Sequence, residues 1–206
     1  MGYQGWQDHE GRDMPTVAVL LADGFETSEA LTVVDVLRRA GIRTRTVSAM
    51  GTRQVISAQQ VQVSADESLE ACDFDDVSCA VLPGGLPAAR RLAADERVAS
   101  VLRDFMARKV VAASDAGSSV LATLGLLDGR LVAAYTGSDV ATCPQATLSD
   151  AAVVADGNLI TSRSMASALG FALSIVNTLA GEQATRKLCD SIGLTFDEPY
   201  DEADPA

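Results

Sequence analysis

VVAASDAG, residues 110–117 of this 206-residue chain, is the stretch of sequence that best predicts the fold. Val110 to Ser114 predicts a short strand of apolar or small residues, and Ala116 to Leu127 predicts a helix directly after it. A strand that passes into a helix through small residues has the geometry of a nucleophile elbow, with Asp115 held at the turn. The stretch therefore predicts an α/β unit that presents a carboxyl group at a sheet edge.

Strands and helices alternate on both sides of this stretch. Upstream, strands are predicted at Thr16–Ala22, Arg43–Ala49 and Ala80–Leu82, a hairpin at Val55–Ser57 and Val61–Ser64, and helices at Ser28–Ala40 and Asp95–Lys109. Downstream, strands are predicted at Leu131–Tyr135, Ala152–Ala155 and Leu159–Ser162, and helices at Ala166–Leu179 and Gln183–Ser191. Strands separated by helices of about 10–15 residues are typical of a mostly parallel sheet with helices on both faces.

The body of the chain is predicted to be one domain. A hydrophobic content of 48% over 206 residues is enough to fill a single core. We expect residues 1–14 to be a flexible leader, residues 15–194 to form the α/β domain, and the acidic residues 195–206 to be a flexible tail without apolar periodicity.

Charge and cysteine usage narrow the classes of partner. The formal net charge of −12 disfavours nucleic acid and anionic membranes, because both surfaces would repel the chain. No apolar run reaches the roughly 18 residues of a membrane helix. The four cysteines form no CxxC pair, which favours free thiols in a reducing compartment. We expect a cytoplasmic protein that acts on a small-molecule substrate.

Histidine is almost absent from the sequence. The single histidine, His9, lies in the leader, so the body of the chain cannot supply a His-based triad or an imidazole metal site. The scattered Asp and Glu residues show no spacing typical of metal ligands. The sequence therefore predicts neither a metal ion nor a cofactor.

Three predicted strand ends carry groups that could bind a ligand or take part in a reaction. Glu29 follows the strand Thr16–Ala22, Gly84 and Gly85 expose backbone amides after Ala80–Leu82, and Asp115 follows Val110–Ser114. Ligands of parallel sheets bind at the carboxyl ends of the strands, so these groups are predicted to meet in one crevice. The amides at the start of the following helix are expected to favour the ionised form of Asp115.

Each of these residues also has a purely structural interpretation. Asp115 could be a helix N-cap that accepts from the amides of Gly117 or Ser118. Glu29 could be an ordinary acid in the first turn of a helix. Pro83-Gly84-Gly85 could be only a turn. Spacing alone leaves the function undecided.

Four sequence motifs, taken together, resemble those of a known protein family. They are LLADGFE (20–26) leading to Glu29, DVLRRAG (35–41), VLPGGLP (81–87) and DGNLITSR (156–163). In this order they resemble the ThiJ/PfpI superfamily, or DJ-one-like proteins, from about Pro15 to Leu194. The resemblance implies a flavodoxin-like sandwich and a homodimer.

The resemblance also implies roles for individual residues. Asp115 stands where the family pattern carries a reactive cysteine, and Glu29 stands where a glutamate is hydrogen-bonded to that cysteine. The amides of Gly85 and Ala116 correspond to oxyanion donors, and Tyr135 stands where many members place a histidine. Because the cysteine is missing, Cys-dependent glyoxalase, deglycase and protease activities are not expected here.

Two functions remain open at this point. In the first, Asp115 is charged, Glu29 keeps a shared proton, and the pair acts as a cofactor-independent hydratase, hydrolase, lyase or isomerase on a small carbonyl-type or otherwise electrophilic metabolite, with Gly85 and Ala116 stabilising an oxyanion. In the second, Asp115 mimics an oxidised cysteine, and the protein is a redox-insensitive module that binds a ligand or a partner without catalysis.

Overall fold

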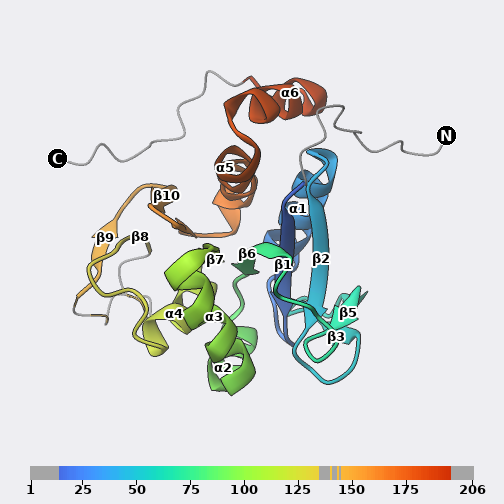
Figure 1. The fold of residues 1–206 in the computed structure, drawn as a ribbon, viewed down its shortest axis with the longest axis vertical. Helices are drawn as coiled ribbons and strands as arrows, with labels where there is room; N and C mark the ends of the chain where they lie inside the picture. Colours follow the sequence, from blue (N-terminus) through green and yellow to red (C-terminus); the bar gives the residue numbers. More distant parts are fainter. Residues whose placement is uncertain (1–13, 135–139, 141–142, 144, 196–206) are drawn as a thin grey trace.

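One mostly parallel sheet organises the chain (Figure 1). The computed structural model describes residues 14–134, 140, 143 and 145–195. The strands of the central sheet stand in the order β10-β11-β7-β6-β1-β2-β5. Their bounds are β1 Thr16–Leu21, β2 Arg43–Ser48, β5 Glu67–Ser68, β6 Val77–Leu82, β7 Val110–Ser114, β10 Val153–Asp156 and β11 Leu159–Ser162.

The central strands are apolar because both faces of the sheet are covered. All six residues of β1 are buried, and β7 is buried from Val111 to Ser114. β1 pairs in parallel with β2 and β6, and β7 pairs in parallel with β6 and β11. Only the edge strand β10 runs antiparallel to its neighbour β11 in this sheet. Nearly continuous apolar strands are what a doubly covered parallel sheet requires.

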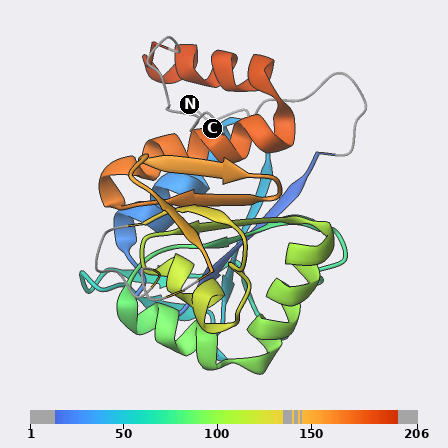
Figure 2. The same ribbon diagram turned by 90° about the vertical axis from the view of Figure 1, so that its left-hand side faces the viewer.

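Helices pack on both faces, as Figure 2 shows. Helices α1 (Thr27–Arg39) and α5 (Ala168–Ala180) contact each other on one face, and α6 (Glu182–Ile192) packs on α5. Helices α2 (Leu86–Ala94), α3 (Glu96–Arg108) and α4 (Gly117–Thr123) lie on the other face. A 3-10 turn, η2 (Met165–Ser167), precedes α5. The predicted flavodoxin-like α/β sandwich is therefore confirmed.

Several elements differ from the sequence prediction. Helix α2 was not predicted, because it has only nine residues and begins directly after the Pro83-Gly84-Gly85 turn, with a further proline in its first turn. The helix predicted to reach Leu127 ends at Thr123, and Gly125 follows with a φ of +67°. Strand β8 (Leu131–Ala133) pairs with β9 (Thr147–Ser149) outside the central sheet, and Tyr135 lies outside the described residues.

The predicted hairpin is present, and the thiols are free. Strands β3 (Gln54–Ile56) and β4 (Gln62–Ser64) pair antiparallel in a separate two-stranded sheet. The four cysteines are all free thiols. Within the described ranges, no helix combines the length and the apolar character needed to cross a membrane.

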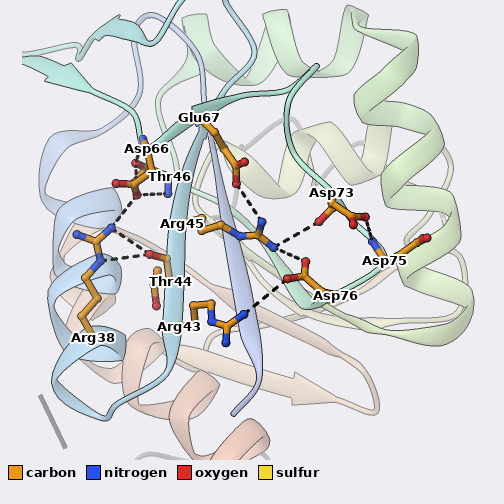
Figure 3. Close-up of polar contacts among 10 residues, drawn as sticks. All are labelled: Arg38, Arg43, Thr44, Arg45, Thr46, Asp66, Glu67, Asp73, Asp75 and Asp76. Carbon is orange, nitrogen blue, oxygen red and sulfur yellow. Dashed lines mark hydrogen bonds and ion pairs between the residues drawn. The ribbon is translucent and has the colours of Figure 1, made fainter. Parts of the chain in front are cut away.

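Charged side chains secure the β2–β5 edge of the central sheet (Figure 3). The Asp66 carboxylate accepts from Thr46 N at 2.8 Å, from Thr46 Oγ1 at 2.9 Å and from Arg38 Nη2 at 2.7 Å. Burial opposes its ionisation, but these hydrogen bonds and the charge of Arg38 outweigh burial, so the pKa of Asp66 is lowered. Arg45 donates to Asp76 beside them. Ionic side chains of this kind protect a sheet edge from further pairing.

Candidate functional site

The candidate site forms where three neighbouring parallel strands end. Strands β7, β6 and β1 are adjacent, so the loops after them share one edge of the sheet. Glu26 N donates to Gly84 O at 2.8 Å, which joins the loops after β1 and β6. Asp115 N donates to Ser162 O at 2.8 Å, which fixes the turn after β7 to β11. The structure thus brings Glu29, Gly84 and Asp115 together, as the sequence predicts.

Asp115 occupies a tight turn between β7 and α4. Its φ is +47°, in the left-handed region that residues other than glycine seldom adopt. The turn leaves no room for a side chain at Gly117, where a Cβ would lie 2.2 Å from Leu82 O. Small neighbours and a strained central residue are the features predicted for a nucleophile elbow.

Glu29 lies below this turn on helix α1, with 1% of its surface exposed. Its Oε2 accepts from the backbone N–H of Gly84 at 2.8 Å. A Cβ on Gly84 would lie 2.5 Å from Glu29 Oε2 and 3.2 Å from Asp115 Cβ. The carboxyl of Glu29 and the side chain of Asp115 therefore flank the space of a single missing methyl group, and only glycine fits there.

The environment of Glu29 favours its neutral form. Burial raises its pKa from 4.5 to about 7, and the negative charges of Asp115 and Glu26 act in the same direction. The Ser114 hydroxyl and the Gly84 amide favour the ionised form and offset part of this rise. Glu29 is therefore an acid that exchanges its proton near neutral pH.

Asp115 is less buried than Glu29, and its pKa is also raised. Burial is the largest cause, the hydrogen bond from Ala116 N–H lowers the pKa, and the charge of Glu26 raises it. The helix amide thus favours the ionised form as predicted, while burial opposes it and gives the net rise in pKa. Among the described residues, the Asp115 and Glu29 carboxyls make no direct hydrogen bond; Asp115 acts on Glu29 through its charge.

Glu26 is a third acid at the site that sequence reasoning missed. Its Oε2 accepts from Gln59 Nε2 at 2.7 Å, and its Oε1 accepts from Ser28 Oγ at 3.2 Å. Gln59 Oε1 also accepts from Thr27 N at 3.2 Å, so the β3–β4 hairpin holds the start of α1. The position of Glu26 beside the DG turn was a signal, but its contact with Gln59 spans 33 residues and has no local pattern.

The backbone amides of the predicted oxyanion site have distinct environments. The Gly84 amide donates to Glu29 Oε2, so in this structure it serves the buried acid. Gly85 has a φ of +103°, and a Cβ there would lie 2.2 Å from Gly24 O. Oxyanion binding by Gly85 and Ala116 stays a prediction. The described residues contain no group of three His, Cys, Asp or Glu side chains arranged to hold a metal ion.

Several known proteins are similar in sequence to this chain. The model of the DJ-1/PfpI family matches residues 15–178. Protein dj-1beta of Drosophila melanogaster is 33% identical over 184 residues, which cover 86% of this chain and 96% of the relative. The glutathione-independent glyoxalase DJR-1.2 of Caenorhabditis elegans is 29% identical over 177 residues, covering 85% and 94%.

A solved structure extends the similarity to the fold. The crystal structure of Drosophila melanogaster DJ-1beta superposes with a TM-score of 0.85 at 32% identity. The superposition covers 89% of this chain and 100% of that one. The two folds therefore agree over most of this chain and the whole of that one.

Proposed function

The chain belongs to the DJ-1/PfpI family, and from this premise we propose that it is a cofactor-independent enzyme. The proposed reaction is acid–base addition of water to a small electrophilic metabolite, such as a carbonyl compound, an epoxide or an unsaturated acid. The observation that carries the proposal is the pairing of a buried acid, Glu29, with a more accessible carboxyl group, Asp115, across Gly84.

The two carboxyl groups have different environments, which assigns them different roles. Glu29 has a pKa of about 7, so a large fraction carries a proton at neutral pH and can donate it. Asp115 accepts a hydrogen bond from Ala116 N–H in its ionised form and is nearer to solvent. Carboxyl groups whose environments differ in this way are suited to act as acid and base.

The proposed step transfers two protons. A water molecule attacks the electrophilic carbon, and Asp115 takes one proton from that water. Glu29 gives its proton to the oxygen, or to the α-carbon, on which negative charge develops. Asp115 then returns its proton to solvent, and Glu29 takes one up, which restores the resting state. Positioned acid–base catalysis contributes about 10²- to 10⁴-fold to rate.

A covalent route through Asp115 is a less favourable version of the same proposal. A carboxylate attacks only activated or strained electrophiles, and the ester must then be hydrolysed by an activated water. The only histidine in the chain is His9 in the leader region. Glu29 would have to supply both the acid and the base in that route, so we favour direct attack by water.

Paired variants test the catalytic proposal. Turnover of carbonyl compounds, epoxides and unsaturated acids is measured for the wild type, Asp115→Asn and Glu29→Gln. We expect both variants to fold and to lose about 10²-fold or more in kcat/KM on any accepted substrate. Asp35→Asn is the matched control, because Asp35 is an exposed acid on the same helix, ion-paired with Arg39. Unchanged turnover in both folded variants contradicts the proposal.

One observation supports the alternative of a non-catalytic module. Ala116 N–H, which is a predicted oxyanion donor, favours the ionised form of the Asp115 carboxyl. A carboxylate that fills the donor site resembles an oxidised cysteine in charge and acceptor number. On this alternative the wild type turns over no compound of the panel, and Asp115→Cys gains a peroxide-sensitive thiol, seen by mass spectrometry as added oxygen.

The setting of the reaction is part of the proposal. We place the protein in the cytoplasm as a homodimer, with a small molecule as its substrate. Four free thiols support a reducing compartment, and the net charge of −12 disfavours nucleic acid as a partner. The name of the glyoxalase relative indicates that the family includes enzymes acting on small metabolites.

A further inference from the structure

Three fully buried serines lie around the turn at Asp115, and they differ in whether their hydroxyls have a hydrogen-bond partner. Ser118 Oγ donates to Ala113 O at 3.4 Å. Ser162 Oγ pairs with Ser167 Oγ at 2.8 Å. Ser114 Oγ has no hydrogen-bond partner of good geometry among the described residues, although none of its surface is exposed.

A buried hydroxyl without a partner is unusual in a protein. It has lost its hydrogen bonds to water and gains nothing in return, so an alanine would be expected at such a position if packing alone mattered. The two residues before Ser114 in β7 are in fact Ala112 and Ala113. The hydroxyl of Ser114 therefore needs an explanation other than packing.

The polar group that the Ser114 hydroxyl acts on is the carboxyl of Glu29. This hydroxyl favours the ionised form of Glu29, as the Gly84 amide also does. Ser114 ends β7, and Glu29 lies on α1, so the interaction bridges the sheet and the helix that covers it. A hydroxyl can rotate to donate to a carboxylate or to accept from a carboxylic acid.

We propose that Ser114 is a positioning residue that stabilises Glu29 after Glu29 has given its proton to the substrate. While Glu29 carries its proton, Ser114 Oγ–H has no anion to bind. When the proton moves from the Glu29 carboxyl to the substrate oxygen or α-carbon, Gly84 N–H and Ser114 Oγ–H both donate to the new carboxylate. The serine keeps its own proton throughout. This inference rests on the proposed function, since it concerns the ionised form that the same acid, Glu29, adopts after it has given up its proton.

Titration of Glu29 in the protein without substrate tests this role. The carbon-13 signal of the Glu29 carboxyl, assigned by its loss in Glu29→Gln, is followed against pH by NMR. We expect Ser114→Ala to move the midpoint upward by about one pH unit, because the ionised form loses a donor. Ser118→Ala removes a neighbouring buried hydroxyl that does not act on Glu29, and it should leave the midpoint in place.

A second variant and a kinetic measurement complete the test. Ser114→Cys keeps the shape of the side chain with a weaker donor, and its midpoint should fall between those of the wild type and Ser114→Ala. If the wild type turns over a substrate, the alkaline limb of its pH–rate profile should move upward with the midpoint in Ser114→Ala.

An unchanged or lowered midpoint in Ser114→Ala or Ser114→Cys overturns the inference. The titration requires no substrate, so its result is separate from the test of the catalytic proposal. A raised midpoint together with no turnover in the wild type would retain Ser114 as a partner of Glu29 and reject the enzymatic function.

Discussion

Glu29 combines almost complete burial with a titratable carboxyl group, and this combination makes stability depend on pH. Its pKa rises from 4.5 in the unfolded chain to about 7 in the folded protein. The folded state therefore binds more protons than the unfolded state between these values, and stability falls as pH rises through this window. The contribution is present in full below pH 4.5 and is lost above about pH 7, with a total of about 3 kcal/mol.

Glu29→Gln should remove this dependence. Glutamine keeps an acceptor for Gly84 N–H but carries no charge at any pH. We expect the variant to be more stable than the wild type by about 2–3 kcal/mol at pH 8, and by much less at pH 5. Urea unfolding at the two pH values measures the difference. An equal difference at pH 5 and pH 8 would show that the cost of ionising buried Glu29 is not its cause.

Gly84 offers a second test of how closely the two acids are packed. A Cβ at this position would lie 2.5 Å from Glu29 Oε2, so Gly84→Ala must displace the Glu29 carboxyl. We expect a loss of about 1–3 kcal/mol in stability from overpacking, together with reduced turnover. Glu29→Ala should relieve part of this cost in the double variant, as a double-mutant cycle measures. Strict additivity would place the clash elsewhere.

Among the elements, the β10–β11 turn depends on one amide side chain. Asn158 Nδ2 donates to Met106 O at 2.9 Å and to Lys109 O at 2.7 Å, where α3 ends and β7 begins. Its Oδ1 accepts from Arg130 Nη2 at 2.7 Å. This residue therefore connects the β10–β11 turn to the end of α3 and to the segment that leads into β8.

Asn158→Ala should destabilise the protein by about 2 kcal/mol, because several partly buried hydrogen-bonding groups lose their partner together. Chemical denaturation measures the change. Gln62→Ala, which removes an exposed side-chain hydrogen bond to Gln54, is the control and should stay within about 0.5 kcal/mol of the wild type. Equal effects of the two changes would contradict the bridging role of Asn158.

The elements differ in how far their sequences reveal them. The central strands and helices α1, α3 and α5 were predictable, because burial on one or both faces leaves apolar runs or helical periodicity. Helix α2 was missed because it is short and directly follows a glycine-rich turn. The turn at Asp115 was predictable from its small neighbours. The third acid, Glu26, and the net effect of burial on Asp115 were not, because both depend on packing between distant segments.

For the whole molecule, the family relationship leads to a prediction of assembly. We propose a homodimer, and the 21.4 kDa chain should therefore elute with a mass near twice that value in size-exclusion chromatography with light scattering. Addition of salt should not dissociate it, since charge repulsion between two chains of −12 is screened rather than strengthened by ions. A single-chain mass at micromolar concentration would reject this assembly.

The close backbone packing around Asp115 also limits how this protein can acquire new specificities. A Cβ at Gly85 would lie 2.2 Å from the carbonyl oxygen of Gly24, and a Cβ at Gly117 would lie 2.2 Å from that of Leu82. Saturation libraries at these two positions should return glycine almost exclusively among folded clones. Laboratory evolution toward other metabolites would instead have to recruit substitutions from exposed segments such as η2, where Met165 is 58% exposed and exchange is expected to leave the acids undisturbed.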